Sequence, residues 1–171
     1  MAQFGAYGST RFAIFFEVLG RKKIPVTTRI LLVDDFEQWR HAVRSILESV
    51  PGLEVAGEAA NGLEAIEKAA TLLPNIVLLD IGMPLLNGIE AAKRIRLSCP
   101  EMKIIFLTQE QDQDVRSTAL ATGAEAYILK SRVGCELLPI IEKAALSRFD
   151  ACVINSRHPK LVRRGSSPER F

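Results

Sequence analysis

Short apolar runs alternate with longer stretches of helical spacing between residues 29 and 147 of the chain. Four of these runs are apolar at every position: Ile30–Val33, Ile76–Leu79, Ile104–Leu107 and Ala126–Leu129. Strands that show no alternation are buried on both faces, as in a parallel sheet that lies between two layers of helices. A fifth run, Leu53–Ala56, contains the charged Glu54, so we expect it at an edge of the sheet.

The stretches between the runs place their apolar residues on one helical face. In the first stretch, 36–50, apolar residues recur at i, i+3, i+4 and i+7 from Trp39, which we expect in the core. The other predicted helices cover 61–72, 86–98, 111–122, which Gly123 would close, and 133–147. The last helix is expected to begin near Cys135, because Pro139 would then lie in its first turn. This alternation predicts a doubly wound α/β fold, a five-stranded parallel sheet with helices on both faces.

Charge divides the chain into a domain and two flanks. Residues 29–147 contain 12 Lys and Arg against 17 Asp and Glu, a net charge of −5, whereas the flanks contain 10 against 3, a net charge of +7. We therefore expect one domain over 29–148, a poorly ordered N-terminal extension over 1–28, and a basic C-terminal tail or linker over 149–171.

The apolar segments and the cysteines indicate a cytoplasmic protein without a membrane contact. The apolar run Phe12–Phe16 is interrupted by Glu17 and is followed by basic residues, which is the reverse of a secretory signal. No segment approaches the roughly 18 apolar residues that a membrane span needs. Three cysteines at wide spacings match neither a disulfide framework nor a zinc site, so we expect reduced thiols.

Polar side chains follow four of the five apolar runs. Asp34 and Asp35 follow the first run, Asp80 follows the third, and Thr108 and Lys130 end the fourth and fifth. The carboxyl ends of parallel strands meet at one edge of a sheet, where ligands bind. Crowded carboxylates repel one another unless a cation lies among them, and Mg²⁺ suits two or three carboxylates with water. A lysine beside them supplies the positive charge for an anion such as phosphate.

The motifs around these residues resemble the response-regulator receiver family over residues 29–147. The matching segments are Ile-Leu-Leu-Val-Asp34-Asp35, Asp80-Ile-Gly-Met-Pro84 with Asn87-Gly88, Phe-Leu-Thr108, and Gly123-Ala-Glu-Ala-Tyr127-Ile-Leu-Lys130-Ser131. The resemblance implies the CheY-like, flavodoxin-like receiver fold. The chain also resembles the branch that is usually fused to a LuxR-type helix-turn-helix output domain.

The resemblance implies that this chain is a phosphorylation switch. Asp80 would be the nucleophile and take a phosphoryl group from a phosphohistidine of a sensor histidine kinase. Thr108 and Lys130 would each contact a phosphoryl oxygen. Thr108 would also act in the switch, and Tyr127 is expected either as a core side chain or as a second switch residue. Beyond phosphorylation and slow dephosphorylation of the chain itself, no enzymatic activity is expected.

The resemblance also implies a Mg²⁺ site. Asp35 and Asp80 would bind the ion directly, Asp34 would orient it through water, and the backbone carbonyl of Gly82 would be a further ligand. Gly88 would let the next helix pack closely.

The chain departs from the family pattern at three positions. Ser131 follows the lysine where many receivers have proline, which leaves open whether the Lys130–Ser131 bond is cis or trans. Gly82 offers no side chain to shield the phosphoryl group, and Glu110 is a carboxylate that could steer a hydrolytic water. Together Gly82 and Glu110 are expected to set the phosphoryl lifetime.

The expected output is a change in a protein-interaction surface. The face formed by the helix at 111–122, the strand at 126–129 and the helix at 133–147 would bind a partner or a second copy of the chain, with Leu120 as a candidate contact. The tail is too short for a helix-turn-helix, so we expect no sequence-specific DNA binding by this chain alone.

Two other classes of function fit parts of the pattern. A magnesium-dependent phosphohydrolase would also use Asp80 as a nucleophile, but the sequence has no cap segment and no second acid close after Asp80. A pseudo-receiver would lack part of the acidic set, which is complete here.

Overall fold

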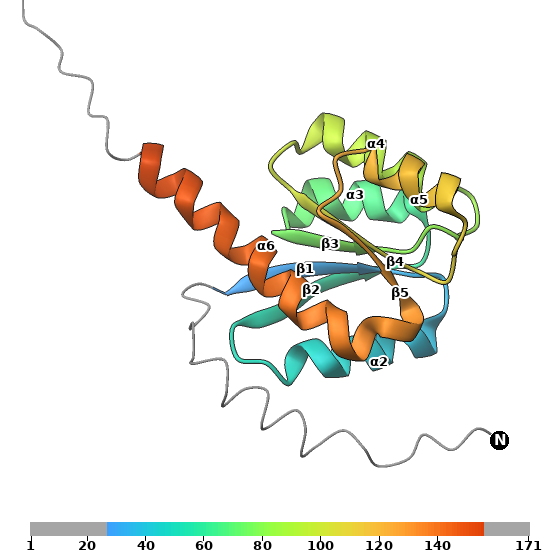
Figure 1. The fold of residues 1–171 in the computed structure, drawn as a ribbon, viewed down its shortest axis with the longest axis horizontal. Helices are drawn as coiled ribbons and strands as arrows, with labels where there is room; N and C mark the ends of the chain where they lie inside the picture. Colours follow the sequence, from blue (N-terminus) through green and yellow to red (C-terminus); the bar gives the residue numbers. More distant parts are fainter. Residues whose placement is uncertain (1–26, 156–171) are drawn as a thin grey trace, which may run out of the picture.

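The protein folds as a parallel sheet between two layers of helices (Figure 1). The computed structural model describes residues 27–155, with side chains up to residue 146. Predictions about residues 1–26 and 156–171 lie outside this part of the chain. The sheet has the order β2-β1-β3-β4-β5, which confirms the five-stranded, doubly wound prediction and the edge position of β2. The strands are β1 (Thr28–Val33), β2 (Leu53–Ala59), β3 (Ile76–Leu79), β4 (Lys103–Thr108) and β5 (Ala126–Leu129).

The helices cover both faces of the sheet. They are α2 (Glu37–Glu48), α3 (Gly62–Leu72), α4 (Gly88–Ser98), α5 (Gln113–Leu120) and α6 (Val133–Asn155), with a short 3-10 turn, η1 (Lys130–Arg132), before α6. In Figure 1, α2 and α6 lie on one face, and α3, α4 and α5 on the other. Successive strand residues point to opposite faces, so Ile30 and Leu32 pack against α2 and α6, whereas Leu31 and Val33 pack in the other core. Both faces of the sheet are therefore buried, as the unbroken apolar runs predict.

Helix α6 begins earlier and ends later than predicted. It starts at Val133, so Pro139 lies inside the helix, and the prediction of a start near Cys135 was wrong. Val133 and Leu137 are buried one turn apart, and this packing stabilises the first turn. Pro139 is on the exposed side, where water can satisfy the carbonyl that loses its partner. The helix continues to Asn155, past the predicted end at residue 147.

Helix α5 is shorter than its predicted range of 111–122. The side chain of Asp112 accepts hydrogen bonds from the backbone N–H groups of Asp114 and Val115, which fixes the start of the helix at Gln113. The helix ends at Leu120, and Gly123, with φ of +83°, lies in the turn that follows it. A glycine adopts this left-handed conformation at little cost.

Candidate functional site

Asp34 and Asp80 lie side by side because their strands are neighbours in the sheet. Val33 of β1 pairs with Leu79 of β3, and each aspartate directly follows the last residue of its strand. The backbone N–H of Asp80 donates to the Val33 carbonyl at 2.9 Å, which locks the two strand ends together. Asp35 joins them, and one carboxylate oxygen from each of the three lies within 4.8 Å of the others. The sequence-predicted acidic cluster therefore forms at the carboxyl edge of the sheet.

The ammonium group of Lys130 lies between two of these carboxylates. Its Nζ is 2.6 Å from Oδ2 of Asp34 and 2.8 Å from Oδ2 of Asp80, and the lysine side chain is 9% exposed. Burial alone would lower the pKa of Lys130, but the bonds to both carboxylates outweigh burial and raise it above its usual value. Lys130 is therefore a firmly protonated cation within the acidic cluster.

The three carboxylates differ in exposure. Asp34 and Asp80 are 1% and 6% exposed, whereas Asp35 is open to solvent. Oδ1 of Asp34 accepts the N–H of Phe36 at 3.0 Å, and Oδ1 of Asp80 accepts the N–H of Ile81 at 2.7 Å. Burial raises the pKa of the Asp34 carboxyl, although the hydrogen bond from Lys130 acts in the opposite direction. Asp35 is thus the most accessible carboxylate of the cluster.

Two glycines frame Asp80. A Cβ added to Gly88, at the start of α4, would overlap the backbone carbonyl oxygen of Asp80, so the helix can approach this closely only with glycine there. This agrees with the expected close packing at Gly88. Gly82 is exposed, and a Cβ added there would meet no atom within 4 Å. The space beside Asp80 is open on that side.

Thr108 ends β4 with its side chain buried, at 2% exposure, and its hydroxyl accepts the N–H of Glu110 at 3.3 Å. The Glu110 carboxylate accepts the N–H groups of Gln111 and Asp112, so in this structure it is held at the loop that leads into α5. Gly82 and Glu110, which are predicted to set the phosphoryl lifetime, are both exposed. The Glu110 carboxylate, however, already accepts hydrogen bonds from the backbone.

Tyr127 of β5 connects the core to the loop after β4. Its ring is buried, 6.4 Å from the ring of Phe106 between centroids, and its hydroxyl donates to the backbone carbonyl of Glu110 at 2.8 Å. Burial and the negative charge of Glu110 raise the pKa of Tyr127. Tyr127 is a core residue, and its hydroxyl is bonded to the loop that follows Thr108. The peptide bond between Lys130 and Ser131, which the sequence left open, is trans.

Trp39 does more than fill the core. It is partly buried and packs from α2 against the core, and the Nζ of Lys130 lies 5.6 Å from the centroid of its ring. This is a cation–π distance. A groove of about 840 Å³ runs beside this pair, lined by Trp39, Ile46, Thr108, Lys130 and Val133 among others. The contact joins two residues far apart in sequence, and no local pattern indicates it.

Arg40 also contacts the site, although no motif in the sequence indicates it. Its Nη1 donates to the backbone carbonyl of Asp34 at 2.7 Å, and its Nε donates to Oε2 of Glu58 on β2 at 2.9 Å. The helical spacing shows only that Arg40 lies off the apolar face of α2, and its partners become visible only in three dimensions.

The fold, the acidic cluster and the buried lysine at one edge of the sheet define the class of protein. A family model described as the response regulator receiver domain matches residues 30–142. The chain belongs to this family, as its motifs predict, and is a response regulator of the two-component type.

Curated relatives include transcriptional regulatory proteins and a response regulator protein. The chain is 38% identical over 117 residues to the transcriptional regulatory protein LiaR of Bacillus subtilis, covering 68% of this chain and 56% of that protein. It is 34% identical over 120 residues to the response regulator protein VraR of Staphylococcus aureus, covering 70% of this chain and 57% of VraR. The chain thus spans about half the length of the curated relatives that it matches.

Solved structures of response regulators are similar to this chain in fold. A two-component response regulator of the LuxR family from Aurantimonas sp. matches with a TM-score of 0.68 and 31% identity, over 77% of this chain and 98% of that chain. The signal receiver domain of the putative response regulator NarL from Mycobacterium tuberculosis matches with a TM-score of 0.68 and 27% identity, over 72% and 100%. The branch suggested by the motifs is therefore confirmed. Within residues 27–155, no helix has the length and apolar character of a membrane span.

Proposed function

We propose that this chain is a Mg²⁺-dependent phosphorylation switch in which Asp80 accepts a phosphoryl group from a phosphohistidine of a sensor histidine kinase in the cytoplasm. The observation that carries the proposal is the position of Lys130, whose ammonium bridges Asp34 and Asp80 at 2.6 and 2.8 Å. A buried cation beside a carboxylate nucleophile is what transfer of an anionic group requires, because phosphoryl transfer depends mainly on positioning and on neutralising charge.

In the transfer, a carboxylate oxygen of Asp80 forms a bond to phosphorus as the bond from phosphorus to the histidine nitrogen breaks. The phosphoryl oxygens then carry negative charge next to Asp34 and Asp35. Lys130 would pair with one phosphoryl oxygen and the Thr108 hydroxyl would donate to another. The backbone of Asp80 is fixed in position for this step, because its N–H is bonded to β1 and its carbonyl packs against Gly88.

The acidic cluster suits a magnesium ion. The carboxylate oxygens of Asp34, Asp35 and Asp80 lie within 4.8 Å of one another, and a hard divalent cation is bound by such oxygens. These three residues and the backbone carbonyl of Gly82 would hold the ion, with Asp34 acting through water. When bound, the ion supplies positive charge that offsets the phosphoryl oxygens.

The output would be a changed protein-interaction surface over α5, β5 and α6. Tyr127 links this surface to the site, because its hydroxyl bonds to the carbonyl of Glu110, two residues after Thr108. A shift of Thr108 toward the phosphoryl group would move that loop and alter the face that carries Leu120, which is 37% exposed. A partner protein or a second copy of the chain would bind there. The relatives are transcriptional regulators, but we expect no sequence-specific DNA binding by this chain alone.

The experiment that tests the proposal compares labelling with turnover. The chain is incubated with Mg²⁺ and acetyl phosphate, and both the mass of the protein and the release of inorganic phosphate from generic phosphate esters are followed. A switch takes up one phosphoryl group per chain and does not turn over the esters. Sustained release from the esters that depends on Asp80 would instead support a phosphohydrolase, and no uptake at all with Mg²⁺ present would contradict the proposal.

A further inference from the structure

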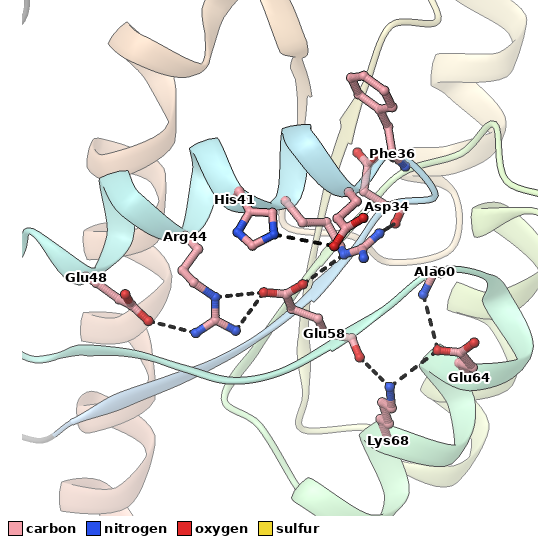
Figure 2. Close-up of polar contacts among 11 residues, drawn as sticks. Asp34, Phe36, His41, Arg44, Glu48, Glu58, Ala60, Glu64 and Lys68 are labelled. Atoms are coloured by element: carbon pink, nitrogen blue, oxygen red, sulfur yellow. Dashed lines mark hydrogen bonds and ion pairs between the residues drawn. The ribbon is translucent and has the colours of Figure 1, made fainter.

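Arg40 connects the acidic cluster to a charged network on the outside of the domain. Its guanidinium bonds to the Asp34 carbonyl at 2.7 Å and to the Glu58 carboxylate at 2.9 Å, and the side chains of Arg40 and Glu58 are only 14% and 22% exposed. Figure 2 shows Glu58 between α2 and β2, where it also pairs with Arg44 at 2.6 Å. Arg44 in turn pairs with Glu48 at 2.7 Å. Two arginines and two glutamates thus form a compact, neutral network.

The carbonyl that Arg40 holds is part of the peptide group between Asp34 and Asp35. The N–H of Asp34 is already bonded to Ala59 of β2 at 3.1 Å, and its carboxylate is bonded to Phe36 and Lys130. The orientation of the next peptide decides where the Asp35 carboxylate points, because a rotation of that peptide swings Asp35 away from the cluster. Asp35 itself is exposed, so packing does not fix its direction.

We propose that Arg40 is a positioning residue for the divalent-cation site, anchored by Glu58, and that it fixes the Asp34–Asp35 peptide so that the Asp35 carboxylate faces Asp80. This inference rests on the proposed function in one respect, namely that the acidic cluster binds Mg²⁺. Replacing a residue that orients the metal ligands, but does not itself bind the metal, typically costs 10- to 100-fold in metal affinity.

The charge of Arg40 and its hydrogen bond to the Asp34 carbonyl lead to opposite predictions for the Mg²⁺ affinity when Arg40 is replaced. Removing a cation near an acidic site strengthens the attraction for Mg²⁺, since one repulsive charge is lost. Removing the hydrogen bond to the Asp34 carbonyl weakens binding, since Asp35 must then be ordered when the ion binds. The sign of the change in affinity therefore separates the two effects.

Arg44 provides the matched control. It lies one turn further along α2 and carries the same charge. It pairs with Oε1 of the Glu58 carboxylate, whose Oε2 accepts from Arg40, and with Glu48, but not with Asp34. Arg40→Met and Arg44→Met each leave Glu58 with one arginine. Both variants lose one positive charge and one ion pair with Glu58. Only Arg40→Met also loses the hydrogen bond to the Asp34 carbonyl.

The test is calorimetric titration of the chain with Mg²⁺ alone, at a temperature where circular dichroism shows each variant to be folded. We expect Arg40→Met to bind Mg²⁺ about tenfold more weakly than wild type, and Arg44→Met to bind equally well or slightly more tightly. Wild-type affinity or tighter binding in Arg40→Met would overturn the inference. If Arg40→Met does not fold, Arg40→Gln, which keeps a polar group at this half-buried position, replaces it with the same expected loss. A wild-type chain that does not bind Mg²⁺ at millimolar concentration would contradict the proposed function instead.

Discussion

The Lys130 ammonium lies 2.6 Å from the Asp34 carboxylate and so supplies a positive charge to the acidic cluster. Lys130 comes from the end of β5 and Asp34 from the end of β1, so the pair joins strands that are not neighbours in the sheet. The pair is almost entirely buried, with side chains 9% and 2% exposed. Its removal should therefore affect folding as well as chemistry.

Lys130→Met should destabilise the protein by roughly 3–5 kcal/mol without Mg²⁺, because removal of one partner leaves buried carboxylates without their counter-charge. Added Mg²⁺ should restore part of this loss. Urea unfolding with and without Mg²⁺ measures both effects. Lys103→Met is the control, since the Lys103–Glu125 pair is more exposed, at 26% and 31%, and should contribute at most about 1 kcal/mol. Equal losses in the two variants would show that the buried position of Lys130 does not matter.

Asp35→Ala should abolish Mg²⁺-dependent phosphorylation and leave the fold intact or slightly more stable without the metal. The residue is exposed, and its removal relieves repulsion with Asp34 and Asp80. Thermal unfolding in the presence of a chelator and labelling by acetyl phosphate check the two parts. A melting temperature well below that of the wild type would mean that Asp35 stabilises the fold in a way that its surroundings do not explain.

Gly88→Ala should destabilise the protein by about 1–3 kcal/mol and reduce phosphorylation. Its Cβ would overlap the Asp80 carbonyl, so either α4 or Asp80 must move. Gly82→Ala serves as the control, because a Cβ there meets nothing within 4 Å. Its stability should match that of the wild type, and any change should appear in the lifetime of the phosphoryl group. A stable, fully active Gly88→Ala variant would contradict the packing seen between α4 and Asp80.

Glu58 should make the stability of the protein sensitive to acid. Burial would raise the pKa of Glu58, but the hydrogen bonds from Arg40 and Arg44 prevail and hold it below its ordinary value of 4.5. A lowered pKa stabilises the fold at pH values above 4.5, and this contribution is lost as the pH falls through the lower value in the folded state.

The Glu58→Gln variant should therefore be less stable at neutral pH and lose less stability on acidification. Urea midpoints measured between about pH 3 and 7 give the slope. Glu67→Gln, which removes an exposed carboxylate from α3, is the matched control and should follow the wild type. Parallel curves for Glu58→Gln and wild type would exclude a linked proton at Glu58.

The sequence predicts most of the fold and the acidic cluster for a simple physical reason. Unbroken apolar runs identify the buried strands, and in a parallel sheet the residues that follow those strands must meet at one edge, as Asp34, Asp80 and Lys130 do. These features follow from periodicity and topology alone, without knowledge of side-chain packing.

Contacts that depend on packing could not be predicted. No local spacing in the sequence indicates the bond from Arg40 to the Asp34 carbonyl or the contact between the Lys130 ammonium and the Trp39 ring. The start of α6 also differs from the prediction, because the burial of Val133 and Leu137 outweighs the preference of Pro139 for the first turn. In each case tertiary contacts outweighed the local preference.

The identity of the phosphoacceptor is the central claim, and intact-mass measurement tests it most directly. Wild-type chain and Asp80→Ala are incubated with Mg²⁺ and acetyl phosphate under the same conditions, with Asp114→Ala, an exposed aspartate of α5, as the control. Wild type and Asp114→Ala should each gain the mass of one phosphoryl group, and Asp80→Ala should gain none. Equal labelling of Asp80→Ala and wild type would contradict the assignment of Asp80.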